Sequence, residues 1–323
     1  MSRPYAHSPI LQFERMLFIR KVEEEIARRY SEQKMRCPVH LSIGQEGAAV
    51  GVCSVLEVTD QIVSNHRCHA HYLAMGGNFK AMLAEIYGKA SGCAGGRGGS
   101  MHLFDNDAGI RASIPIVAGG IPLAGGIALS KKVKDEAGIA VAFFGDGAVE
   151  EGVFHETLNF AKVRNLPLLF VCENNQFSVY TGLSERQPDD NMLRYADASG
   201  IKNIRVNGSL VGEVADNVQI LTDFIRKDKA PAFIQIDTYR WLEHCGPNGD
   251  DNLGYRVASE TEKWKKRCPV ALLQEELINK NIITLSALTE ISKRLDKTIA
   301  EIFETAIKDD FPIATTAGDH VYA

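Results

Sequence analysis

The chain has 323 residues, of which 45% are hydrophobic and 24% charged, and its formal net charge is −5 at pH 7, an ordinary composition for a globular protein. The basic residues are scattered along the chain, which argues against a nucleic-acid-binding protein. No apolar run approaches the length of a membrane span, and no apolar core follows the first residues as in a secretory signal. The seven cysteines are widely spaced without a CxxC pair, which predicts a reducing compartment, the cytoplasm, without disulfides or zinc.

The first part of the chain is predicted to be mainly helical. Residues 10–35 carry apolar side chains at helical spacing among many charges, and residues 47–56 are small and apolar. A short strand is predicted at 61–64 and a helix at 79–88. Residues 92–99 contain five glycines and are predicted to form a loop, because so many glycines make a helix costly.

A strand–helix–strand unit is predicted in the middle of the chain. Residues 139–144 and 166–172 are apolar runs typical of buried strands, and residues 150–164 between them have helical spacing. The helix predicted at 121–133 contains several small residues, which predict close approach by another element.

Further strands are predicted at 201–206 and 232–238, followed by a charged helical tail over about 261–306. No repeat, low-complexity tract or linker is present in the sequence. We therefore expect one α/β domain over residues 1–323, built on a parallel sheet, with helical extensions at the tail and over about 10–56.

Two polar motifs follow the paired strands. Gly145–Gly147 ends the first strand and Asn174–Asn175 ends the second, so Asp146 and Asn175 are expected at the carboxyl edge of the sheet. Their oxygens are hard ligands for a small divalent cation, and the glycines allow backbone N–H groups to approach an anion. Each motif alone is common in turns and loops, but together on this unit they predict a metal and diphosphate site.

This pattern is typical of thiamine-diphosphate enzymes. The segments from Gly145 to Gly152 and from Cys172 to Phe177 resemble the alpha subunit of the decarboxylating component of 2-oxo acid dehydrogenase complexes, a family that includes pyruvate, branched-chain 2-oxo acid and acetoin dehydrogenases. Further segments match in the expected order: 40–46, 64–71, 95–102, 116–117 with 121–123, and 238–244.

The resemblance implies a thiamine-diphosphate-binding fold and a magnesium ion. Asp146, Asn175 and the backbone carbonyl of Phe177 would bind the metal, and diphosphate oxygens and water would complete an octahedron. The alternative for the two side chains is a turn-capping Asp and a hydrogen-bonding Asn. The turn would hold the cofactor through Gly145, Gly147 and Ala148.

The histidine-rich segment is expected at the same site. Arg67 would hold the diphosphate with its two-pronged guanidinium, whereas the alternative is a solvated surface arginine. His66 stands where pyruvate-type members usually carry Tyr, and together with His71 it resembles the acetoin-type branch.

Three further residues are assigned by resemblance. His69 and His244 are similar to histidines that face the reacting substrate, where they would move protons or stabilise the intermediate, and His244 would also contact the cofactor. Val117 would pack near the aminopyrimidine or thiazolium ring. The alternatives are packed or loop histidines and an ordinary core valine.

The resemblance also implies partners. The glutamate that activates the aminopyrimidine belongs to a separate beta subunit in this family, so we expect the chain to be inactive alone and to form an α₂β₂ heterotetramer. The acyl group would pass to a lipoyl acyltransferase partner. The predicted function is therefore that of an alpha subunit of a 2-oxo acid or acetoin dehydrogenase.

Departures from the family pattern keep other functions open. Leu242 replaces a usual histidine, and Pro115 and Ala118 replace usual glycines, near the expected substrate. One alternative is a non-oxidative carboligase or decarboxylase with an aldehyde, ketone or proton as acceptor. A non-catalytic scaffold is a second, and a dinucleotide-binding dehydrogenase is set aside because no GxGxxG follows a strand.

Overall fold

The structure, a computed structural model, describes residues 7–319. Its centre is a six-stranded sheet in which every adjacent pair is parallel. The strands are β1 (Gln61–Ser64), β2 (Ile110–Ser113), β3 (Ala140–Gly145), β4 (Leu168–Asn174), β7 (Lys202–Asn207) and β8 (Ala232–Asp237). They lie in the order β2-β1-β3-β4-β8-β7, which confirms the predicted α/β parallel-sheet fold. A separate antiparallel pair consists of β5 (Phe177–Ser178) and β6 (Thr181–Gly182).

Both faces of the sheet are buried, which explains the uninterrupted apolar runs of the central strands. In β3, Val141 and Phe143 belong to one hydrophobic cluster, whereas Ala142 and Phe144 belong to the cluster on the opposite face. The alternation follows from the two-residue period of a strand.

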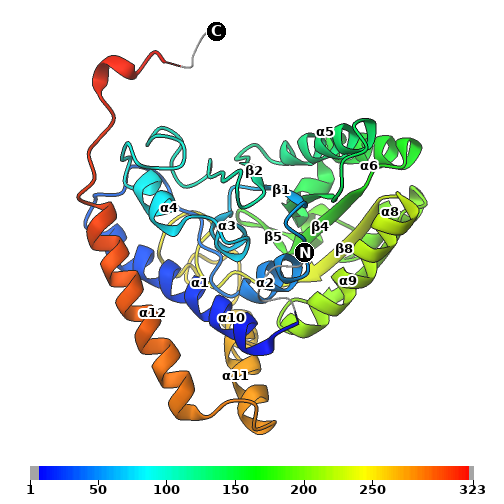
Figure 1. Ribbon diagram of the computed structural model, residues 1–323. Coiled ribbons are helices and arrows are strands. Elements are labelled where there is room, and N and C mark those ends of the chain that lie inside the picture. Colours follow the sequence, from blue (N-terminus) through cyan, green and yellow to red (C-terminus); the bar gives the residue numbers. More distant parts are fainter. Residues whose placement is uncertain (1–6, 320–323) are drawn as a thin grey trace.

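Helices cover the two faces. One hydrophobic cluster contains residues from α1 (Pro9–Tyr30), α2 (Glu46–Ser54), α3 (His69–Ala74), α4 (Phe79–Ile86), α9 (Val211–Asp228), α11 (Pro269–Asn279) and α12 (Leu285–Ala306). The other contains residues from α5 (Gly120–Val133), α6 (Gly152–Arg164) and α8 (Leu193–Ala198). In Figure 1, strands β4 and β8 lie between the α5–α6 pair and α9. The remaining elements are α7 (Leu183–Arg186), α10 (Ala258–Lys265) and two 3₁₀ turns, η1 (Asp146–Glu150) and η2 (Ala314–Thr316).

The helical tail is confirmed, but it begins earlier than expected and consists of three helices. Pro269 stands in the first turn of α11, where its missing N–H is not needed, and so separates α11 from α10. Thr284 caps the start of α12, and its side chain accepts a hydrogen bond from the Ala287 N–H. The helix packs against α1 and α4, with Phe303 fully buried.

The small residues of α5 allow another helix to pack closely against it, as the sequence predicts. A Cβ atom added to Gly125 would lie 3.3 Å from Cγ2 of Thr157 on α6, so the two helices meet at this glycine. The sequence analysis assigned no element to β2, α3, α8 or α9, which the structure adds.

The strand order fixes the place of the site. From β1 the chain passes to β2 on one side of it and then to β3 on its other side, so the direction of winding reverses between β1 and β3. In open parallel sheets, ligands bind beyond the carboxyl ends of the strands at such a reversal. Among residues 7–319, no helix is long and apolar enough to cross a membrane.

Candidate functional site

A cavity lies beyond the carboxyl ends of β1, β3 and β4, where the reversal predicts it. The structure brings ten of the eleven predicted site residues to its wall. They are His66, Arg67, Val117, Gly145, Asp146, Gly147, Ala148, Asn175, Phe177 and His244. His69 is the exception.

Asp146 is a fully buried carboxylate at the end of β3. Its Oδ1 accepts a hydrogen bond from the Asn175 N–H at 3.1 Å, and its Oδ2 pairs with the guanidinium of Arg186 on α7. Burial raises the pKa of the Asp146 carboxyl, while Arg186 and the Asn175 N–H oppose the rise. Arg186 thus places a positive charge beside this buried carboxyl.

The amide of Asn175 is held in one orientation. Its Nδ2 donates to Oε1 of Gln45 at 3.4 Å, and its Oδ1 accepts from the Phe177 N–H at 3.1 Å. The cavity wall thus offers oxygens from two segments: the carboxylate of Asp146 after β3, and the side-chain amide of Asn175 with the backbone of Phe177 after β4. This all-oxygen donor set fits a magnesium ion.

The Gly-Asp-Gly turn presents its backbone to the cavity. The 3₁₀ turn η1 begins at Asp146, and the first N–H groups of a helical turn have no partner within it. A Cβ atom added to Gly147 would lie 2.7 Å from Oγ of Ser178, so a larger residue there would force Ser178 to move. Together with Ala148, these N–H groups fit a diphosphate.

Arg67 is buried, so the surface-arginine alternative is wrong. Its Nη1 donates to the Leu41 carbonyl at 2.7 Å and its Nη2 to the His244 carbonyl at 3.1 Å. Burial lowers the pKa of Arg67 to about 10. The guanidinium ties two loops together at the wall of the cavity, where its charge is available to an anion.

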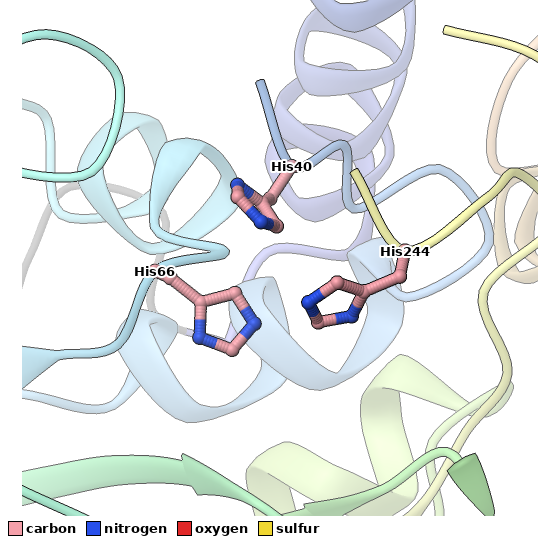
Figure 2. Close-up of side chains that lie close together, drawn as sticks. All are labelled: His40, His66 and His244. Atoms are coloured by element: carbon pink, nitrogen blue, oxygen red, sulfur yellow. The ribbon is translucent and has the colours of Figure 1, made fainter. Parts of the chain in front are cut away.

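Three histidine rings meet on the same wall, from the segments before α2, after β1 and after β8 (Figure 2). The ring centroid of His40 lies 4.8 Å from that of His66 and 5.0 Å from that of His244, and the last two are 5.2 Å apart. Burial and the Arg67 charge lower the pKa of His40 to about 3, of His66 to about 2 and of His244 to about 4. All three rings are therefore neutral at pH 7.

The structure does not bring His69 to the cavity, contrary to the expectation that it faces the substrate. It is the first residue of α3 and fully buried, with Nε2 2.7 Å from Oγ of Ser100 and Nδ1 3.4 Å from Oε1 of Glu23. Its contacts anchor the end of the glycine-rich loop to α1.

Val117 is 49% exposed and lines the cavity, so the core-valine alternative is wrong. Pro115 and Ala118 line it as well. Ala118 has a φ of 59°, in the left-handed region that favours glycine, which explains why glycine is the usual residue there. Leu242 packs against the hydrophobic core instead.

Sequence reasoning missed other residues at the site. His40 opens a matched segment but received no role, and Arg186 has no local signal at all. A buried chain of contacts joins Ser64 Oγ to His71 Nδ1 at 2.8 Å and His71 Nε2 to Glu173 Oε1 at 3.1 Å, and its two ends line the cavity.

The glycine-rich loop over residues 92–99 already holds an anion of the chain itself. The buried Glu85 carboxylate accepts hydrogen bonds of 2.7–3.0 Å from four backbone N–H groups of this loop, those of Ala94, Gly96, Gly98 and Gly99. These four N–H groups therefore have a partner within the chain, and the Glu85 carboxylate holds the loop in place.

Comparisons with known proteins identify the family of the chain. Residues 14–314 match the family described as the dehydrogenase E1 component. The chain is 30% identical over 310 residues to the pyruvate dehydrogenase E1 component subunit alpha of Rickettsia bellii, which covers 96% of this chain and 94% of that protein. It is 33% identical over 300 residues to the alpha subunit of acetoin:2,6-dichlorophenolindophenol oxidoreductase of Bacillus subtilis, which covers 93% of this chain and 89% of that protein. The resemblance carried by the motifs is thereby confirmed, and the chain belongs to the dehydrogenase E1 component family.

Proposed function

We propose that the chain is the alpha subunit of a thiamine-diphosphate-dependent 2-oxo acid or acetoin dehydrogenase. One observation carries the proposal: the oxygens of Asp146 and Asn175 and the guanidinium of Arg67 meet in one cavity at the carboxyl ends of parallel strands. A cation site and an anion site side by side suit a metal diphosphate.

The chain's own residues would divide the work of holding the cofactor. Asp146, Asn175 and the carbonyl of Phe177 would bind Mg²⁺, and the N–H groups of Gly147 and Ala148 would bind the diphosphate. When bound, thiamine diphosphate supplies the carbon nucleophile and the electron sink of the reaction.

The neutral histidines give the cavity wall proton donors and acceptors. His244 and His66 can each donate from one ring nitrogen and accept at the other, so they can orient a substrate carbonyl or carboxylate and move a proton. His69 acts at a distance in this proposal, by positioning Ser100 and the glycine-rich loop.

A beta subunit would complete the site in an α₂β₂ assembly. Ile116 and Val117 on the cavity wall are 73% and 49% exposed, and such apolar side chains favour a covering partner. The relatives named above are themselves alpha subunits. A lipoyl acyltransferase as acyl acceptor and a cytoplasmic location, consistent with seven free cysteines, complete the proposal.

A non-oxidative carboligase is the second candidate, because Pro115 and Ala118 change the cavity wall itself. Both lie where the family usually carries glycine, so they narrow the space beside Val117. Such a change alters which acceptor fits without touching the metal and diphosphate residues.

The test is a turnover assay on the chain co-expressed with its adjacent beta-type subunit. The assay contains thiamine diphosphate, Mg²⁺ and a panel of 2-oxo acids and acetoin, and it follows both an artificial electron acceptor and carbon dioxide release. Reduction of the acceptor supports the dehydrogenase and names its substrate. Carbon dioxide release with a new carbon–carbon bond instead favours the carboligase, and full turnover by the chain alone would contradict the heterotetramer.

A further inference from the structure

The three-histidine cluster, His40 with His66 and His244, has the ligand chemistry of a metal site. One ring nitrogen of each histidine lies within 4.8 Å of the others. Figure 2 shows a nitrogen of His66 and a nitrogen of His244 turned toward each other, with the ring of His40 beside them. The cluster joins three segments that are far apart in the chain, so only the fold creates it.

One of these nitrogens lacks a partner. His40 is 6% exposed, and its Nδ1 has no hydrogen-bond partner among the described residues. Buried polar atoms nearly always have a partner in the protein or in something bound to it. The His40 Nδ1 is therefore available to a ligand or metal that enters the cavity.

The cluster differs in kind from the oxygen site at Asp146 and Asn175. Magnesium prefers oxygen ligands, whereas neutral imidazoles suit zinc, cobalt and copper. Three histidines with an open fourth position form the ligand set of an accessible zinc site. The two ends of the cavity would therefore select different ions.

We propose that His40, His66 and His244 form a second metal site, which binds a zinc-type transition ion when the cofactor is absent. Tetrahedral zinc with Zn–N bonds of ~2.05 Å places its nitrogens ~3.3 Å apart. The nitrogens must close from 4.8 Å at most, which small side-chain rotations can supply.

Arg67 determines the fourth ligand. Its Nη2 donates to the His244 carbonyl at 3.1 Å and lies 3.5 Å from Nδ1 of the same histidine, so a positive charge stands beside the cluster. That charge opposes a bare dication and favours an anionic fourth ligand such as hydroxide or chloride. The complete site is thus three imidazoles and one anion.

The site has a consequence that rests on the proposed function. His66 and His244 line the same cavity as Asp146 and Asn175, so we expect the ion and thiamine diphosphate to compete for it. A transition ion would then act as an inhibitor of cofactor loading, and the cofactor would in turn expel the ion.

Cobalt titration tests the site without reference to activity. Co²⁺ is added to the full chain, co-purified with its beta-type subunit and freed of cofactor by dialysis, and the visible bands of four- or five-coordinate cobalt are recorded. We expect one cobalt per chain. His40→Asn and His66→Asn should each weaken binding at least tenfold, whereas His155→Asn, an exposed histidine on α6, should not.

Asp146→Ala separates the two metal sites. This variant should bind cobalt as the unmodified chain does, because Asp146 does not belong to the cluster. In the unmodified chain, Mg²⁺ with thiamine diphosphate should remove the cobalt bands.

The proposal is overturned if no such bands form, or if they persist in both histidine variants. Bands that keep full strength while the cofactor binds would overturn the mutual exclusion. Cobalt binding in a chain that never binds thiamine diphosphate would support the histidine site and count against the proposed function, so the two failures are distinguishable.

Discussion

Two glycine-containing segments of this chain look alike in sequence and differ in what faces their backbone. In the loop over residues 92–99, four N–H groups converge on the carboxylate of Glu85. In the turn at Gly145–Gly147, the backbone faces an open cavity beside Asp146. Glycine makes close approach to the backbone possible in both segments. The Glu85 carboxylate orders the first segment, whereas we propose that the second binds the diphosphate of a cofactor.

Removing the Asp146 charge from the turn at Gly145–Gly147 should have the largest effect, which is on cofactor affinity. Asp146→Ala deletes the buried carboxylate that we propose binds the metal, so we expect metal-dependent affinity for thiamine diphosphate to fall at least ~100-fold, about 2.8 kcal/mol. The measurement is the rise of the thermal midpoint on adding cofactor and Mg²⁺, which a bound ligand produces by mass action.

The matched control for this variant is Asp216→Ala, an exposed aspartate on α9. It should keep the full rise of the midpoint. A rise that persists in Asp146→Ala would show that Asp146 does not bind the metal. Both glycine-containing segments would then have only structural roles.

Removing the Glu85 charge, which holds the loop over residues 92–99, should lower the stability of the fold and leave cofactor binding unchanged. Glu85→Gln leaves loop N–H groups facing an amide that cannot accept from all four of them, which should cost ~3 kcal/mol of unfolding free energy. We expect the thermal midpoint to fall by about 5 °C, with unchanged cofactor affinity in the folded fraction.

Glu275→Gln, on the exposed side of α11, is the control and should leave the midpoint in place. If Glu85→Gln instead weakened cofactor binding as strongly as Asp146→Ala does, the glycine-rich loop would belong to the binding site and the comparison would fail.

The difference between these segments also marks the limit of sequence reasoning. The meeting of Asp146, Asn175 and the Gly-Asp-Gly turn at one cavity could be predicted because two buried strands and their trailing motifs lie in one β-α-β unit, whose geometry is local. The pairing of Asp146 with Arg186 and the unpartnered His40 depend on segments distant in the chain. His69 was misplaced because the contacts that turn it inward come from Glu23 on α1 and from Ser100.

The buried histidines on the cavity wall should also make the stability of the fold sensitive to acid. The pKa of His66 is lowered to about 2, against about 6.5 in an unfolded chain, so between these values the unfolded state binds more protons. Stability should therefore fall as pH drops below 6.5, by roughly 1.4 kcal/mol per pH unit for this histidine. Thermal midpoints from pH 7.5 to 5.5 measure the slope.

His66→Asn should reduce the total slope by about one third, because His40 and His244 keep their lowered pKa values, and His155→Asn should leave it unchanged. The same slope in His66→Asn as in the unmodified chain would show that the buried histidine is not the source of the acid sensitivity.

The smallest expected effect is on turnover, and it concerns the contact between His69 and Ser100. His69 contacts Ser100 at the end of the glycine-rich loop, so His69→Ala and Ser100→Ala should lower turnover by a similar, few-fold factor and leave cofactor affinity unchanged. Steady-state kcat and KM of the co-expressed complex measure both. A loss of turnover far larger in His69→Ala than in Ser100→Ala would show that His69 acts on the substrate directly.

The central claim is that the cavity at the ends of β1, β3 and β4 binds a metal diphosphate cofactor. Calorimetric titration of the co-expressed complex with thiamine diphosphate, with and without Mg²⁺, tests it most directly. We predict one site per alpha chain, with binding at least tenfold tighter when Mg²⁺ is present. No binding, or equal affinity without the metal, would contradict the role assigned to Asp146 and Asn175.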